Sequence, residues 1–374
     1  MYDVITLSGT DFEIGLQHGQ QCQQQIKASL TNYQNMFREL AGLSWAQVLE
    51  YAALEQDRLQ QLDPSAFEEM AGIAEGSGFT LLEILSLNIR SELLFAVTGE
   101  TTSCHDGCTS FASMPHANDE QAMMLGQNWD WIEAQREACF IAHVQPVSGP
   151  HYCMVTEAGI IGKIGFNNAG VGVCFNALSC GFDPTGWPAH LLLRRILRSP
   201  NLISAMNWPL LNQSMCAANY LIASADGAAY SVEVTPGNVD IIPDQQHSGV
   251  IVHTNHLIGE KNKTVPDPTV KLMGASTYHR LHRCTQLLTD NNSASFERLR
   301  AILGDHSGGH EGICQHPSNK AGLLGTLSSV FSIVINLSEQ KAEISMTNPC
   351  QGESFSVRFV GDQLIWGESH ACHS

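Results

Sequence analysis

The step from Gly107 to Cys108 brings a reactive side chain next to an unhindered peptide bond. Glycine has no side chain, so the thiol that follows can reach the carbonyl of the preceding peptide bond. Attack there would move the acyl group from nitrogen to sulfur, and water would then cut the chain at the thioester. Cys108 would become an N-terminal residue whose α-amine, of ordinary pKa about 8, can act as the base for its own thiol. The pair alone does not decide this chemistry, because most cysteines fill cores.

Three polar residues further along the chain could complete such a site. Asp130 lies in Trp129-Asp130-Trp131, where a carboxylate could be held near a nucleophile while the indoles exclude water. Asn176 follows a glycine-rich stretch and Asn255 follows an apolar run, and a fixed amide can donate to developing negative charge. Each residue also has a structural interpretation, which is a strand end with packed indoles for Asp130 and a turn for either asparagine.

A second group of reactive side chains lies between residues 305 and 316. This segment contains His306, His310, Cys314 and His316, all of them ligand types found in zinc sites. A zinc hydrolase built on these histidines is therefore the alternative to a cysteine nucleophile. The terminal stretch His370-Ala371-Cys372-His373 could also bind metal, although a frayed end is the simpler interpretation.

Composition restricts the classes of protein to be considered. The 374 residues, 43% of them hydrophobic, are enough for one large domain with a sizeable core. The 19 basic and 37 acidic residues give a net charge of −18, which disfavours nucleic acid and anionic membranes as partners. No basic region followed by an apolar run begins the chain. We therefore expect a soluble, cytoplasmic protein, in which most of the 12 cysteines are buried thiols.

The elements that must position these side chains change in character at Cys108. Before it, helical spacing predicts one helix from about Phe12 to Leu40, capped by Thr10 or Asp11. Further helices are predicted to begin after Ser44, at Pro64 and at Thr80, with Glu69 and Glu75 as solvated charges on the third helix.

After Cys108, short apolar segments between turn residues predict strands, with helices between and after them. The predicted strands are Ala122–Asn128, Cys139–Gln145, Tyr152–Glu157, Ile160–Phe166, Gly170–Ala177, Ala218–Ser224, Tyr230–Thr235, Val250–Thr254, Leu327–Asn336, Lys341–Met346 and Ser354–Phe359. The predicted helices are Pro188–Leu197, Tyr278–Leu288 and Phe296–Leu303. Grouped strands with helices around them predict layered α+β packing in one domain.

Taken together, these segments resemble the penicillin acyltransferase-type family of N-terminal-nucleophile hydrolases, which is also classed as a family of self-processing cysteine peptidases. The matching stretches are Asp106-Gly107-Cys108-Thr109, Gly126-Gln127-Asn128-Trp129-Asp130, Thr156–Asn167, Asn176-Ala177-Leu178 and His253-Thr254-Asn255-His256. Upstream, Glu75-Gly76-Ser77-Gly78 and Leu87–Glu92 look like the family's helical region. The order and spacing of these stretches over most of the chain carry the resemblance.

The resemblance implies a four-layer αββα sandwich of the N-terminal-nucleophile hydrolase type, with two antiparallel sheets between helical layers. Residues 1–374 would form a single domain that cuts itself between Gly107 and Cys108. Residues 1–107, the α subunit, and residues 108–374, the catalytic β subunit, would then stay associated. The resemblance implies no cofactor and no bound metal.

The resemblance also assigns roles to single residues. Cys108 would be the nucleophile, Asp130 would help to orient the new N-terminus, and Asn255 would be the oxyanion-hole asparagine. Asn176 is a looser match to a second asparagine beside the oxyanion. Penicillin-making members carry an arginine before a late strand, whereas Gly325–Phe331 has none here, which weakens the expectation of penicillin-type substrates.

The function implied is that of an amidohydrolase or acyltransferase acting on a small-molecule amide or acyl donor. An acyl-Cys108 intermediate would form and pass its acyl group to water or to an amine, and the sequence does not choose between these acceptors. The alternative is a family relative that serves as a small-molecule binding protein without catalysis or without processing.

Overall fold

The computed structural model describes residues 3–98, 107–244, 248–269, 271, 274–290 and 295–368. Its strands form two sheets, an eight-stranded sheet A and a seven-stranded sheet B. The strand order of sheet A is β1 (Val4–Gly9), β4 (Cys139–Pro146), β5 (Tyr152–Glu157), β6 (Ile164–Asn167), β7 (Val171–Phe182), β8 (Cys216–Ser224), β9 (Ala229–Thr235) and β10 (Asn238–Ile242). The strand order of sheet B is β11 (Val250–His253), β2 (Thr109–Ser113), β3 (Met124–Ile132), β12 (Leu327–Asn336), β13 (Lys341–Ser345), β14 (Phe355–Val360) and β15 (Gln363–Glu368).

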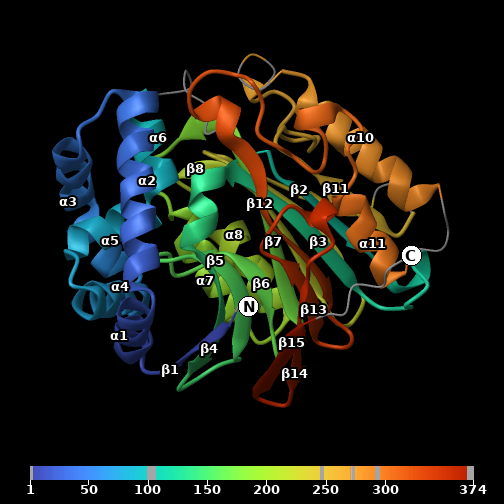
Figure 1. Ribbon diagram of the computed structural model, residues 1–374, viewed down its shortest axis with the longest axis horizontal. Helices are drawn as coiled ribbons and strands as arrows, with labels where there is room; N and C mark the ends of the chain where they lie inside the picture. Colours follow the sequence, from blue (N-terminus) through green and yellow to red (C-terminus); the bar gives the residue numbers. More distant parts are fainter. Residues whose placement is uncertain are drawn as a thin grey trace.

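Helices lie on the outer side of each sheet. On the side of sheet A are α1 (Asp11–Gln21), α2 (Gln23–Ala41), α3 (Trp45–Leu62), α4 (Pro64–Ser77), α5 (Leu81–Asn88), α6 (Arg90–Thr98), α7 (Ala189–Leu197) and α8 (Leu202–Leu211). On the side of sheet B are α10 (Ser276–Thr289) and α11 (Phe296–Leu303), drawn in orange in Figure 1. The two sheets contact each other through β2 and β3 on one side and β7 and β8 on the other. The predicted four-layer αββα architecture is therefore confirmed.

The pairing of the strands departs from the expectation in one place. Described neighbours pair antiparallel, except that β1 runs parallel to β4 at the edge of sheet A. A strand before the first helix was not predicted, because its pairing partner is far away in the sequence and six residues carry little local signal. The short β2 and β10 and the last strand, β15, were also missed.

The predicted helix starts are confirmed by their caps. Thr10, Ser44 and Thr80 each accept a hydrogen bond from the third residue of the helix, whose side chain bonds back to the cap. The single helix expected from Phe12 to Leu40 is instead α1 followed by α2, because the backbone leaves the helical region at Cys22, with φ −111° and ψ 21°. Neither glycine nor proline marks this break in the sequence.

Backbone contact joins α1 to α4. Gly15 and Gly19 of α1 lie against the main chain of α4, while Gly72 and Gly76 of α4 lie against the main chain of α1. A Cβ atom on Gly15 would overlap the carbonyl oxygen of Glu69. Small residues four positions apart share one helix face, so this pair of helices packs closer than side chains would allow.

Ion pairs connect the helices before Cys108 to those after it. Glu69 was predicted to be solvated, but it is buried and accepts a hydrogen bond from Nε of Arg194 at 2.6 Å. Nη2 of Arg194 also bonds to Asp11 at 2.8 Å. Glu75 is exposed, as expected. The prediction failed for Glu69 because its partner lies on α7, which local sequence cannot place.

Two expectations from composition can be compared with the structure. Nine of the ten described cysteines are buried, and Cys350 is exposed. No helix in the described part of the chain is long and apolar enough to cross a bilayer. The residues His105, Asp106 and His370–His373, named above for their chemistry, lie outside the described ranges.

Candidate active site

Cys108 directly precedes β2, which lies between β11 and β3 in sheet B. The residue is buried, and its carbonyl oxygen accepts two hydrogen bonds. One comes from Nδ2 of Asn176 at 3.2 Å and the other from Nη1 of Arg280 at 2.7 Å. Asn176 belongs to sheet A and Arg280 to the outer helix α10, so groups from both sides of sheet B hold the main chain of Cys108.

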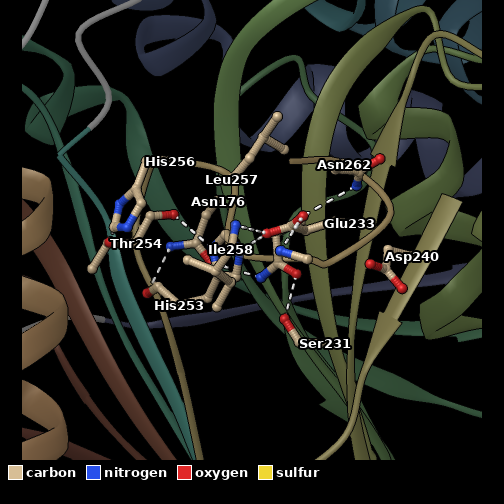
Figure 2. Close-up of polar contacts among 12 residues, drawn as sticks. Asn176, Ser231, Glu233, Asp240, His253, Thr254, His256, Leu257, Ile258 and Asn262 are labelled. Carbon is tan, nitrogen blue, oxygen red and sulfur yellow. Dashed lines mark hydrogen bonds and ion pairs between the residues drawn. The ribbon is translucent and has the colours of Figure 1, made fainter. Parts of the chain in front are cut away.

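Asn176 lies inside β7, so its interpretation as a turn residue is wrong. Its Oδ1 accepts from Oγ of Ser110 at 2.6 Å and from Nδ2 of Asn219 at 3.1 Å. Its Nδ2 donates to Cys108 and, more weakly, to the carbonyl of His253 at 3.5 Å (Figure 2). Both ends of this amide are bonded within the protein. Asn176 is therefore arranged to position the nucleophile candidate.

Asn255 follows β11 by two residues and is buried. Its Oδ1 accepts a hydrogen bond from Nη2 of Arg280 at 3.0 Å, and its Nδ2 donates to the carbonyl of Ala177 at 3.1 Å. Because the Arg280 guanidinium binds Oδ1 of Asn255, the Nδ2 group of Asn255 must point away from the guanidinium. An amide nitrogen carries two hydrogens, and Ala177 is its one acceptor among the described residues. The second hydrogen can serve a substrate oxygen.

Arg280 was not recognised as a site residue from the sequence, because an arginine on a predicted helix is ordinarily interpreted as a surface charge. It is fully buried, and its guanidinium joins Cys108 to Asn255. Nη1 also donates to Oγ1 of Thr109 at 3.0 Å, and Nε donates to Oγ of Ser276 at 3.2 Å. No local pattern marks this residue, because its partners lie on other elements.

A buried carboxylate fixes the segment on either side of Asn255. Oε1 of Glu233 on β9 contacts Nε2 of His253 at 2.8 Å and accepts from the main-chain nitrogen of Ile258 at 2.7 Å (Figure 2). Oε2 accepts from Gly259 and from Nδ2 of Asn262. Burial alone would raise the pKa of Glu233, but these bonds and the neighbouring histidine lower it below its ordinary value. The carboxylate therefore anchors both ends of the segment from His253 to Asn262, of which only His253–His256 stood out in the sequence.

Asp130 lies on β3, and its Oδ1 accepts a hydrogen bond from Oγ of Ser329 on β12 at 2.6 Å. The pairing of β2 with β3 sets Thr109 opposite Asn128. Because the two strands are antiparallel, β3 continues from this pair to Asp130 at the same end at which the chain before β2 leads back to Cys108 and Gly107. Asp130 therefore lies at the end of the β2–β3 pairing from which Cys108 and Gly107 extend.

Gln315 connects Asp130 to Gly107 from a third segment. Its main-chain nitrogen donates to Oγ of Ser329 at 2.9 Å, the same hydroxyl that bonds to Asp130. Its side chain packs so closely on Gly107 that a Cβ atom there would overlap it. Because these atoms are the end of a flexible side chain, a Cβ atom at residue 107 would require the Gln315 side chain to move.

The indoles of Trp129 and Trp131 do not cover the carboxylate between them. Successive side chains of a strand point to opposite faces, and the two rings stack on each other with centroids 6.0 Å apart. Nζ of Lys163 lies 3.5 Å from the ring centroid of Trp129. The expectation that the indoles exclude water around Asp130 is wrong, because strand alternation turns them to the other face.

An arginine does contact the late strand that lacks one in its own sequence. Arg136 of η3 (Glu133–Ala138) donates to the carbonyls of Val330 at 2.6 Å and Ser329 at 3.1 Å, and to Oγ of Ser328 at 3.2 Å. These bonds stabilise the start of β12, the strand that presents Ser329 to Asp130.

The zinc alternative is altered by the structure. In the described part of the chain, the side chains that gather are His306, Cys314, His316 and Cys350, while His310 lies outside the group. The fold therefore does not bring His306, His310 and His316 together as the ligands of a catalytic zinc. The four residues are considered separately below.

Comparison with known proteins assigns the family. The family model for acyl-coenzyme A:6-aminopenicillanic acid acyl-transferase matches residues 116–351. The chain is 32% identical over 256 residues to the acyl-coenzyme A:6-aminopenicillanic-acid-acyltransferase 40 kDa form of Emericella nidulans, which covers 68% of this chain and 69% of that protein. The chain belongs to the acyl-coenzyme A:6-aminopenicillanic acid acyltransferase family. The resemblance found in the sequence is thereby confirmed, and the family match includes Asp130, Asn176 and Asn255 but begins after Cys108.

Solved structures give weaker likenesses. The N-acylethanolamine-hydrolyzing acid amidase ortholog of Caenorhabditis elegans is 14% identical, with a TM-score of 0.44, and covers 62% of this chain and 93% of its own. Penicillin V acylase from Agrobacterium tumefaciens is 13% identical, with a TM-score of 0.42, and covers 70% of this chain and 86% of its own. The architecture of this family member follows from its own strand order and helical layers.

Proposed function

We propose that the protein cuts itself between Gly107 and Cys108 and then works as an amidohydrolase or acyltransferase through an acyl-Cys108 intermediate. The observation that carries the proposal is the convergence on Cys108 of Asn176 and of Arg280, which also holds Asn255. A buried cysteine that only fills a core needs no such arrangement of polar groups around its main chain.

In the cleavage step, the Cys108 thiol attacks the Gly107 carbonyl. A carbon–sulfur bond forms, the amide carbon–nitrogen bond breaks, and the nitrogen takes a proton to become the α-amine of Cys108. Water then hydrolyses the thioester, which gives a Gly107 carboxylate and restores the thiol. Asp130 is linked to Gly107 through Oγ of Ser329 and through Gln315, whose side chain packs on Gly107. Its carboxylate can hold the new ammonium group by charge-assisted hydrogen bonding.

In turnover, the α-amine takes the proton of the Cys108 thiol, and the thiolate attacks the substrate carbonyl. Asn255 donates its remaining amide hydrogen to the oxyanion of the tetrahedral intermediate. Arg280 and Asn176 hold the main chain of Cys108 in position. The leaving group receives the proton from the ammonium, and the acyl-enzyme then transfers its acyl group to water or to an amine.

Residues 1–107 and 108–374 would stay together after cleavage because a buried ionic cluster spans them. Glu157 accepts from Nη2 of Arg90 at 2.9 Å and from Nζ of Lys163 at 2.5 Å, and it also bonds to Tyr33. Burial alone would raise the pKa of Glu157, but the charges of Arg90 and Lys163 lower it to about 2. Tyr33 and Arg90 precede the proposed cut and Glu157 and Lys163 follow it, so separation would take the Arg90 cation away from the Glu157 carboxylate.

The name of the Emericella nidulans relative states the kind of substrate to try first. It describes acyl transfer between acyl-coenzyme A and 6-aminopenicillanic acid, which are a thioester donor and an amine acceptor. The same acyl-Cys108 intermediate would serve an amide donor and water. The assay therefore offers acyl thioesters and N-acyl amides, each with and without a primary amine.

The test is to trap and follow the acyl-enzyme. Purified protein is mixed with each donor, quenched within seconds and analysed by intact mass spectrometry, and the products are identified by chromatography. We expect the acyl mass on the fragment that begins with Cys108, and product in proportion to enzyme. Cys108→Ala should show neither, whereas Cys284→Ala, which removes a buried thiol of α10 outside the site, should show both.

The same assay separates the proposed function from its alternative. A folded wild-type protein that binds these donors, but neither acquires the acyl mass nor releases product, would be a binding protein. Acyl transfer at an undiminished rate by Cys108→Ala would remove the proposed nucleophile.

A further inference from the structure

Four metal-binding side chains meet on the outer side of sheet B. His306 follows α11, Cys314 and His316 lie in the loop after η4 (Gly309–Glu311), and Cys350 lies in η6 (Pro349–Gln351). Their ligand atoms all lie within 4.8 Å of one another. Cys314 is buried, His316 is partly buried, and the other two are exposed. The group is therefore accessible to an ion from solvent and closed on its inner side.

Hydrogen bonding alone does not account for this arrangement. Nε2 of His316 lies 3.1 Å from Nε2 of His306, 3.4 Å from Sγ of Cys314 and 3.4 Å from Sγ of Cys350. A neutral imidazole nitrogen has either one hydrogen or one lone pair, so it cannot bond to three such atoms at once. A cation at the centre would satisfy all four side chains together.

We propose that His306, Cys314, His316 and Cys350 bind one zinc ion as a structural site. Zinc bonds of about 2.0–2.1 Å to histidine nitrogen and about 2.3 Å to cysteine sulfur give tetrahedral edges of about 3.3–3.8 Å. The contacts of His316 Nε2, at 3.1–3.4 Å, are close to this range, and the remaining pairs of ligand atoms lie within 4.8 Å of each other. Two thiolates and two neutral imidazoles balance the charge of Zn²⁺, and binding releases the two thiol protons.

The composition of the group indicates the metal and its task. Thiolate and imidazole together select zinc over magnesium or calcium, which prefer oxygen. Four protein ligands complete a tetrahedron and leave no position for a water nucleophile, as in structural zinc sites. The site therefore differs from the zinc hydrolase considered from the sequence, in both its ligands and its chemistry.

The zinc would stabilise the loop that touches the candidate active site. Gln315 lies between two of the ligands, its side chain packs on Gly107, and its carbonyl accepts from Nδ2 of Asn348 at 2.7 Å. Asn348 is two residues from the Cys350 ligand. Zinc would thus fasten the loop to the turn at residues 348–350 and fix Gln315, which bonds to the hydroxyl that contacts Asp130. This consequence rests on the proposed function, whereas the zinc site itself does not.

The experiment measures zinc in protein expressed without a histidine tag and dialysed against metal-free buffer after incubation with zinc sulfate. We expect about one zinc per chain by elemental mass spectrometry, and a higher melting temperature than after chelation. Cys314→Ser and His306→Ala should lose the zinc, and His310→Ala, which changes a histidine of the same loop outside the group, should keep it. Cobalt in place of zinc should give the visible absorption of tetrahedral thiolate coordination in the wild type and in His310→Ala only.

Two results would overturn the site. One is zinc retained at the wild-type level by both Cys314→Ser and His306→Ala. The other is wild-type protein, purified under reducing conditions, that takes up no zinc although its thiols are intact, or that instead contains a Cys314–Cys350 disulfide. If the variants do not fold, the same readouts on wild type, before and after chelation and zinc addition, decide the question. If Cys314→Ser and His306→Ala lose the zinc but still cleave themselves normally, the zinc site is supported and its role is limited to stability.

Discussion

Arg280 donates a hydrogen bond of 2.7 Å to the main-chain carbonyl of Cys108, across 172 residues of sequence. The same guanidinium bonds to Oδ1 of Asn255 at 3.0 Å. One buried cation therefore sets the distance between the proposed nucleophile and the proposed oxyanion donor. Since a displacement of about 1 Å in a reacting group can cost about a hundredfold in rate, Arg280 should matter for catalysis without touching the substrate.

Arg280→Lys should lower kcat by about ten- to a hundredfold, because one ammonium nitrogen cannot occupy the two positions from which Nη1 bonds to Cys108 and Nη2 bonds to Asn255. KM should change little, since Arg280 has no proposed contact with substrate. Steady-state kinetics on folded protein measure both constants. Arg283→Ala, on the same helix but paired with Asp305, is the control and should keep normal kinetics. A change confined to the melting temperature would make Arg280 a structural residue only.

Asn255→Ala should lower kcat by about a hundred- to a thousandfold, which corresponds to about 3 kcal/mol for one lost oxyanion donor. Folding should be disturbed far less, because the side chain makes two hydrogen bonds among the described residues. Turnover and urea denaturation on the same preparation separate the two effects. Normal specific activity in the folded fraction, together with a collapse of stability, would be incompatible with the assigned role.

Glu157→Gln should destabilise the protein by about 3–5 kcal/mol, because it leaves buried Arg90 and Lys163 without their carboxylate. In cleaved protein, the two fragments should separate at lower urea concentration than in the wild type, as followed by size-exclusion chromatography. Glu75→Gln changes an exposed carboxylate and is the control. Equal urea dependence for both variants would show that the cluster does not hold the fragments together.

The free energy of unfolding should fall as pH is lowered from 7 to 5. Burial lowers the pKa of His18 to about 3, and that of His143 and His256 to about 4. Below the histidine pKa of about 6.5 in the unfolded chain, these histidines are protonated in the unfolded chain but stay neutral in the folded chain. Lowering the pH therefore favours unfolding. His18→Gln can still accept the bond from Gly159, and it should reduce the slope by up to about 1.4 kcal/mol per pH unit. Urea denaturation at several pH values measures this, and an unchanged slope would contradict it.

The layered fold and the order of most elements were predictable because they depend on local patterns. Thr10, Ser44 and Thr80 cap their helices through contacts three residues away, and the apolar segments of sheets A and B are visible in the sequence. The strand β1 was not predictable, because its pairing with β4 is a long-range contact.

The same distinction holds within the candidate site. Cys108, Asp130, Asn176 and Asn255 could be proposed because they lie in short recognisable stretches. Arg280, Glu233 and Gln315 could not, because each acts through a partner distant in sequence and its own neighbours are ordinary. Cys350 likewise joins the zinc-binding group only through folding, 34 residues after His316.

The central claim is that Cys108 cuts the chain before itself and becomes the nucleophile. Intact mass spectrometry of freshly purified wild type, Cys108→Ser and Cys108→Ala tests it most directly. The account predicts two fragments in the wild type, of which the second begins with Cys108. Cys108→Ser should be cleaved slowly or not at all, because its hydroxyl is a weaker nucleophile. Cys108→Ala should remain an intact chain. An uncut wild-type chain that is folded and catalytically active, or a Cys108→Ala chain cut at the same bond, would contradict it.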